Sequence, residues 1–155
     1  MATIKLDPIV KSVTVPCSQT QAFEAFTRNL QSWWPLESHS VGLENALSCE
    51  MECRQGGELF EIAKGGEKHI WGTIQDWSPP GELTFSWHPG RAPETAQVIT
   101  VSFQAQGDGT RVTLTHGGWE TLGDAAAETR AGYVQGWDLV LGQLFVNECA
   151  KIVAD

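Results

Sequence analysis

Glu61 is the side chain of this sequence best suited to acid–base chemistry, and its orientation decides whether it can perform any. It lies in the segment Glu58–Ala63, where the side chains of a strand would point in turn to opposite faces. If Leu59 faces the interior, Glu61 does too, and a buried carboxylate must be paired, hydrogen-bonded or neutral. It could then hold a ligand hydroxyl or amine, or act as a general acid. If Phe60 and Ile62 face inward instead, Glu61 is a solvated surface charge.

Two histidines are the candidate partners of that carboxylate. His116 continues the alternation of Val112 and Leu114, so we expect it to reach the interior. His39 follows two tryptophans in a loop that could border the mouth of a cavity. A histidine with a glutamate is the smallest credible general acid–base set. The alternative is that one is a hydrogen-bonded structural histidine and the other a surface side chain.

Aromatic side chains are the second group with functional potential. The chain has seven Trp and six Phe but one Tyr. An aromatic side chain supplies apolar area, and each indole adds one N–H that can orient a polar group. Cavity lining and plain core packing are alternative roles for six of the tryptophans: Trp33, Trp34, Trp71, Trp87, Trp119 and Trp137.

The sequence lacks the spacings that mark several other kinds of site. No histidine pair has zinc-ligand spacing, and no glycine cluster has the pattern of a P-loop or a dinucleotide-binding turn. We therefore expect neither a metal nor an organic cofactor. Three glycines, Gly132, Gly136 and Gly142, interrupt a helical segment at a cost of about 1 kcal/mol each. Close approach of the sheet, room for a ligand or a helix contact would offset that cost.

The elements that must position these residues follow from the periodicity of the chain. A strand is expected at Ile9–Pro16, and a capping box at Ser18–Gln21 begins a short helix that ends or turns near Trp33-Trp34-Pro35. Period-two segments separated by Gly-rich and Pro-rich breaks then predict an antiparallel meander. Its expected strands are Leu47–Arg54, Glu58–Ala63, His69–Trp77, Leu83–His88, Val98–Gln106 and Arg111–His116.

A long amphipathic helix is expected near the C-terminus, from about residue 124 to residue 153. Tyr133, Trp137, Leu141 and Phe145 lie on its apolar stripe. A curved sheet with one apolar face needs such a cover, so the fold class is α+β, in a single domain of 155 residues.

Several short motifs, taken in order, resemble one known family. The chain is similar to the helix-grip fold of the SRPBCC superfamily, which includes the START and birch-pollen-allergen-like domains. Within that superfamily it resembles the family of the activator of heat-shock protein 90 ATPase. The residues that carry the resemblance are Phe23–Phe26, Trp33-Trp34-Pro35, Gly56–Glu61, Trp71-Gly72, Asp76–Trp87, Gly107–Val112, His116–Glu120, Tyr133 and Gly136-Trp137.

The resemblance implies a curved sheet of about six or seven strands around the long helix, with two short helices after the first strand. It also implies a cavity between sheet and helix, which in relatives holds apolar molecules. The family motif places a glutamate after the double glycine, which favours the inward orientation of Glu61. The ligand-binding candidates are Trp33, Trp34, His39, Glu61, Trp71, Phe85, Trp87, Val101, His116, Trp119, Tyr133, Trp137 and Leu141; Glu61 and His116 are also the catalytic candidates.

The charge balance excludes several kinds of partner. Ten basic and 19 acidic residues give a net charge of -9, which disfavours binding to nucleic acid and to anionic membranes. No apolar run approaches the roughly 20 residues of a spanning helix, and the N-terminus lacks an apolar signal region. Four cysteines without a disulfide framework fit a reduced cytoplasm. A homodimer through the long helix or an edge strand is compatible with the sequence.

Three functions are consistent with these features. The leading hypothesis is a protein that binds an apolar or aromatic small molecule in the cavity. The second is a cofactor-independent cyclase, hydrolase or isomerase that uses Glu61 with a histidine as acid and base. The third is a chaperone-related protein-interaction module, which would need an exposed apolar patch.

Overall fold

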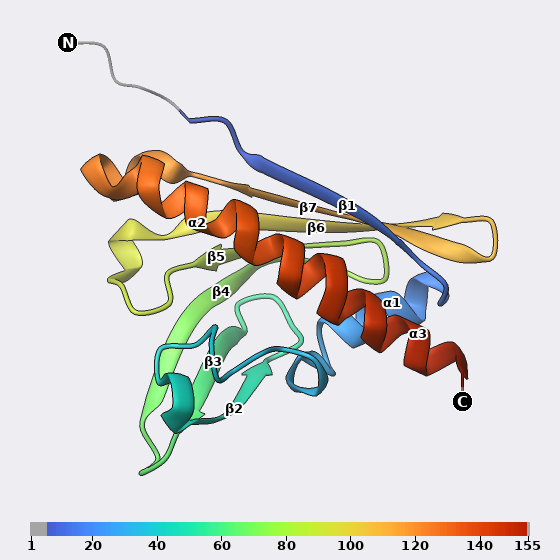
Figure 1. Cartoon of the computed structure of the whole chain (residues 1–155), viewed down its shortest axis with the longest axis horizontal. Helices are drawn as coiled ribbons and strands as arrows, with labels where there is room; N and C mark the ends of the chain where they lie inside the picture. The colour runs from blue at the N-terminus through green and yellow to red at the C-terminus, as the bar shows by residue number, and fades with distance from the viewer. Residues whose placement is uncertain (1–5, 155) are drawn as a thin grey trace.

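A seven-stranded antiparallel sheet forms the body of this protein, and one long helix crosses it (Figure 1). The computed structural model describes residues 6–154. The strand order is β1-β7-β6-β5-β4-β3-β2, so β2 to β7 form the expected meander and β1 lies beside β7. The strands are β1 (Ile9–Val15), β2 (Ala46–Met51), β3 (Glu58–Ala63), β4 (Lys68–Ser78), β5 (Glu82–Trp87), β6 (Gln97–Gln106) and β7 (Gly109–Gly117).

The segment between β1 and β2 carries the chain from one edge of the sheet to the other. It begins with helix α1 (Gln19–Phe26), and the predicted capping box is confirmed. The Ser18 hydroxyl accepts a bond from the Gln21 backbone N–H, and the Gln21 side chain accepts one from the Ser18 N–H. The 3₁₀ turn η1 (Leu30–Ser32) follows and brings the chain to the paired tryptophans, and a second, η2 (Leu43–Asn45), precedes β2.

The C-terminal helix is continuous but not uniform. It starts with the 3₁₀ segment η4 (Trp119–Ala125), continues as α2 (Ala126–Leu139), widens into the π-helical turn η5 (Val140–Phe145) and ends as α3 (Val146–Ala154). The apolar stripe in the sequence did not predict the π turn, which closes i→i+5 bonds. Leu141, Phe145 and Cys149, spaced four residues apart, are all buried.

The core lies between the concave face of the sheet and this helix. Alternation along the strands is as predicted: Leu83, Phe85 and Trp87 of β5 are buried, as are Ile99, Val101 and Phe103 of β6. Figure 1 shows the helix running diagonally across the sheet, with α1 beside α3 at the C-terminal end. The helix-grip α+β fold is therefore confirmed.

The structure also bears on membranes. Within residues 6–154, none of the helices combines the length and the apolarity that a bilayer crossing would need.

Candidate functional site

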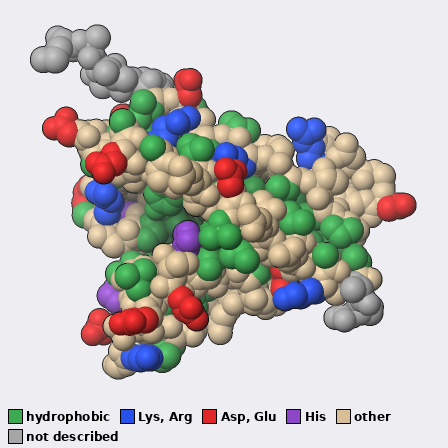
Figure 2. All heavy atoms as spheres, viewed as in Figure 1, with side chains coloured by type: hydrophobic (Ala, Val, Ile, Leu, Met, Phe, Trp, Pro, Cys, Tyr) green, Lys and Arg blue, Asp and Glu red, His purple; other side chains and the backbone are tan. Residues whose placement is uncertain are grey.

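A pocket of about 490 Å³ opens between α2 and the sheet, near the N-terminal half of the long helix. Figure 2 shows a hollow in this face, lined by hydrophobic side chains and with a histidine at its edge. Three elements contribute to it: the loop after the paired tryptophans, the end of β5 and one face of α2. The lining residues are Trp34, Ser38, His39, Ser40, Val41, Trp87, Pro89, Gly90, Thr129, Gly132, Tyr133, Gly136, Trp137 and Val140.

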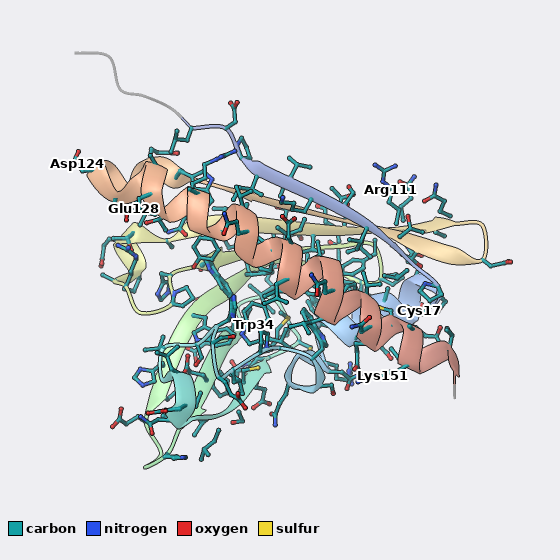
Figure 3. The ribbon with its side chains drawn as sticks, in the orientation of Figure 1. Cys17, Trp34, Arg111, Asp124, Glu128 and Lys151 are labelled. Atoms are coloured by element: carbon teal, nitrogen blue, oxygen red, sulfur yellow. The ribbon has the colours of Figure 1, made fainter. Side chains whose placement is uncertain are left out.

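Three tryptophans form the aromatic wall of the pocket. Trp34 comes from the loop, Trp87 from β5 and Trp137 from α2, and their ring centroids lie 5.8 to 6.2 Å apart. Figure 3 labels Trp34, which lies beneath the long helix. Because the three rings are tilted toward one another, each supports the next and their positions are fixed.

The indole N–H groups of this wall are all bonded to the protein itself. Trp34 donates to the His39 carbonyl at 2.7 Å, and Trp137 donates to His116 Nδ1 at 3.1 Å. Trp87 donates to the Tyr133 hydroxyl at 2.9 Å. An indole has one donor and no acceptor. The three tryptophans therefore offer a ligand their apolar rings, not their N–H groups.

The helical side of the pocket is opened by glycine. Gly132 and Gly136 are one helical turn apart and both line the pocket. A Cβ atom at Gly132 would have nothing within 4 Å, and one at Gly136 would lie 3.9 Å from His39 Nε2. The space beside the helix thus exists because these two positions carry no side chain. Of the three explanations given above for the destabilising glycines in this helix, these two positions fit the one that requires free space beside the helix.

Glu61 holds the loop that forms the opposite wall. Its carboxylate is fully buried, which agrees with the inward orientation of Leu59 and Glu61. Oε1 accepts bonds from the Val41 N–H at 2.6 Å and the Trp71 indole at 2.7 Å. Oε2 accepts a bond from the Gly42 N–H at 2.9 Å. Three donors on one carboxylate satisfy a buried charge, so Glu61 anchors the loop from behind and does not line the pocket.

His116 is a buried, fully bonded base behind the aromatic wall. Nδ1 accepts the Trp137 N–H, so the ring proton belongs on Nε2, which donates to Gln97 Oε1 at 3.3 Å. The ring also stacks on Trp119 at 4.3 Å between centroids. Burial lowers the pKa of His116 to about 3 because a charged imidazolium would be desolvated. His116 is therefore neutral near pH 7.

His39 is the histidine that lines the pocket. Its Nδ1 lies 2.7 Å from the Ser38 hydroxyl, and its Nε2 faces the open position at Gly136. Partial burial lowers the pKa of His39 below its usual value of about 6.5. A neutral imidazole at the edge of the pocket can exchange a proton with a bound molecule.

The family model described as Activator of Hsp90 ATPase homolog 1-like protein matches residues 16–146. The chain belongs to this family. The resemblance inferred from the sequence is therefore confirmed. A search of curated proteins matches none to this sequence.

Solved structures of similar proteins extend the family assignment. Txn09, an anthrahydroquino-gamma-pyrone synthase solved in complex with SUM, is 33% identical over 80% of this chain and 84% of its own, with a TM-score of 0.59. CalC of Micromonospora echinospora, a self-sacrificing resistance protein, is 26% identical over 94% of this chain and 95% of its own, with a TM-score of 0.70. The Aha1 dimer of Colwellia psychrerythraea is 17% identical over 90% and 93%, with a TM-score of 0.65, and shares the fold.

The structure divides the predicted site residues of this family member into three groups. The pocket brings together Trp34, His39, Trp87, Tyr133 and Trp137. Glu61 and His116 lie one layer behind, bonded to pocket residues. The remaining candidates are buried core residues that do not line the pocket: Trp33, Trp71, Phe85, Val101, Trp119 and Leu141.

Sequence reasoning missed nine lining residues. Two of them, Gly132 and Gly136, carried a signal, because glycines inside a helix need an explanation. The others belong to irregular segments or gave no signal of their own: Ser38, Ser40, Val41, Pro89, Gly90, Thr129 and Val140. Within the described part of the chain, no three His, Cys, Asp or Glu side chains are grouped to hold a metal ion.

Proposed function

We propose that this protein binds a planar aromatic small molecule in the pocket beneath α2. The observation that carries the proposal is the wall of Trp34, Trp87 and Trp137, whose N–H groups are all bonded internally. Such a wall favours a ligand that stacks an aromatic ring on the indoles, and its N–H groups are not available to hydrogen-bond a flexible polar ligand. A pocket of about 490 Å³ is within the usual size range for small-molecule sites.

Two relatives support this proposal by their names. Txn09 is named a synthase and was solved with a bound compound, SUM. CalC is named a resistance protein. The two share the fold with this protein over 80% and 94% of this chain.

Native mass spectrometry of the purified protein is the first test of ligand binding. We expect an adduct of one aromatic molecule per chain, which denaturing extraction would release for identification. The same spectrum reports whether the protein is a monomer or a dimer. Titration with Nile red, a neutral aromatic dye, gives the affinity of the pocket independently of what co-purifies.

Gly136→Leu is the variant that tests the location of the site. A leucine there fills the space between His39 and the helix, so Nile red affinity should fall at least tenfold. Gly142→Leu is the matched control, because it makes the same change in the same helix at a position that is exposed and does not line the pocket. Equal Nile red affinity in both folded variants would contradict the proposed location.

A catalytic function is the second candidate, favoured by the 33% identity to a synthase. Glu61 and His116 are bonded behind the wall, so His39 is the better placed acid–base group. The extracted compound would be incubated with fresh protein and its mass followed with time. Turnover that disappears in a folded His39→Gln variant with unchanged ligand affinity would establish an enzyme; an unchanged compound would leave a binding protein.

A further inference from the structure

The Tyr133 hydroxyl differs from the other polar groups of the aromatic wall because its proton is uncommitted. Its recorded hydrogen-bond partner among residues 6–154 is the Trp87 indole, at 2.9 Å. An indole N–H can only donate, so Tyr133 must accept this bond with an oxygen lone pair. The phenolic proton is then left for another acceptor, on a side chain that lines the pocket.

The tyrosine is held in place from several sides. Its ring packs against His116 at 4.8 Å, Trp119 at 5.8 Å and Trp137 at 6.5 Å between centroids. Trp87 is itself buried in β5, so the bond to the hydroxyl also fixes the phenol along the pocket wall. Burial raises the pKa of Tyr133, so the hydroxyl keeps its proton near neutral pH.

Among the other polar groups of the lining, His39 Nε2 also faces the open space beside Gly136, whereas Ser40 and the indoles are bonded to partners in the protein. The Ser40 hydroxyl donates to the Leu36 carbonyl and accepts the Leu43 N–H. The three indoles of the wall are bonded as described above. A hydroxyl that already accepts a hydrogen bond becomes a better donor, because bonds in a chain polarise one another. The Trp87–Tyr133 pair therefore forms a fixed donor at the edge of an apolar aromatic surface.

We propose that the pocket selects an aromatic ketone or quinone, whose carbonyl oxygen accepts a hydrogen bond from Tyr133 while its rings stack on the tryptophans. This inference rests on the proposed binding function and specifies the chemical class of its ligand. The match is one acceptor on the ligand to one donor in the protein, in a site where an unpaired hydroxyl would otherwise be desolvated.

Two probes that differ in one group test this selection. Fluorene and 9-fluorenone are planar tricycles of nearly the same shape, but 9-fluorenone carries a carbonyl oxygen. Their affinities would be measured by displacement of Nile red. In the wild-type protein we expect 9-fluorenone to bind roughly five- to tenfold more tightly, as one hydrogen bond predicts. Tyr133→Phe should bring that ratio to about one while leaving fluorene affinity almost unchanged.

A second measurement does not depend on how well the variant folds. The carbonyl stretch of 9-fluorenone bound to the wild-type protein should lie at lower frequency than in an apolar solvent, because the oxygen accepts a bond. Equal affinities for the two probes in the wild type, or an unshifted carbonyl stretch, would contradict the selection of a ketone or quinone but would not contradict the proposed binding pocket. Failure of both probes to displace Nile red would contradict the proposed binding function and this inference with it.

Discussion

The space between the sheet and the long helix has two ends that are built differently. At the end near α1 and α3, aromatic rings pack edge to face or tilted, with centroids 5.1 to 6.0 Å apart: those of Phe26, Trp33, Phe103 and Phe145. We call this the filled end. At the other end, which we call the open end, the tryptophan wall faces the pocket of about 490 Å³. One sheet and one helix thus support both a closed core and a cavity.

The residues of the helix explain this difference. Toward the filled end the helix presents Leu141, Phe145 and Cys149, all of which are buried. Toward the open end it presents Gly132 and Gly136, which put nothing into the space. The indoles of the open end are in addition each bonded through N–H to a partner in the protein, which fixes the wall beside the empty space. A cavity in this fold therefore needs both missing side chains and anchored walls.

Phe145→Ala tests the filled end and should have the largest effect. Its ring is fully buried against Phe26 and Trp33, so we expect a loss of about 3–5 kcal/mol in the free energy of unfolding. Chemical denaturation would measure it. Tyr133→Ala at the half-buried pocket wall is the comparison and should cost less, because the pocket already lies beside it. Equal losses of unfolding free energy in the two variants would contradict the distinction between the filled end and the open end.

Much of this division could be predicted from the sequence, and the reasons for the exceptions are physical. Alternation gave the inward faces of β5 and β6 and the interior position of His116, because period two fixes the face of a strand. It could not choose between Leu59 and Phe60 as the inward residue of β3, since both are apolar. Nor could alternation distinguish the tryptophans that line the pocket from those in the core, because that distinction depends on the distance between the helix and the sheet.

The loop that closes the open end was the least predictable part. Residues 38–42 have no periodicity, and the Val41 and Gly42 amides are bonded to Glu61 from a strand about 20 positions later. The sequence favoured an interior Glu61 only through the family motif, and it suggested an acid–base role. The structure gives this carboxylate three donors and no access to the pocket, and two of those donors are backbone N–H groups that no side-chain pattern reveals.

Glu61→Gln should have the next largest effect and tests the anchoring of the wall. The amide replaces one acceptor oxygen with a donor that would face an existing N–H. We expect a loss of roughly 3 kcal/mol in the free energy of unfolding. Hydrogen exchange at the Val41 and Gly42 amides should also accelerate. Glu50→Gln on the exposed side of β2 is the control and should change neither quantity; unchanged amide exchange in Glu61→Gln would contradict the anchoring role.

His116 predicts how the stability of the open end depends on pH. Its pKa is about 3 in the folded chain and about 6.5 when unfolded. Between these values the unfolded state binds more protons, so the free energy of unfolding falls as pH decreases from 6.5. The contribution of this one group is about 2 kcal/mol between pH 6.5 and pH 4.5.

His116→Gln isolates this contribution, because glutamine can still accept the Trp137 N–H but does not titrate. Denaturation curves of both proteins at several pH values would measure the difference between their slopes. The wild type should lose more stability than the variant as pH falls. Parallel pH dependence in the two proteins would mean that His116 has the same pKa in the folded and the unfolded chain, and the lowered pKa of this buried base would be wrong.

Gly132→Ala should have the smallest effect, and its sign tests why the pocket is open. The added methyl group meets nothing within 4 Å, and alanine is preferred inside a helix by up to about 1 kcal/mol. The free energy of unfolding should therefore rise slightly. Gly123→Ala is the contrasting control, because its φ of +57° is strained for an L side chain and stability should fall. If Gly132→Ala instead destabilised the protein, the fold itself would require this glycine. A gain in stability would mean that the glycine is kept for the space beside it, which is the expected mark of a site selected for what it binds.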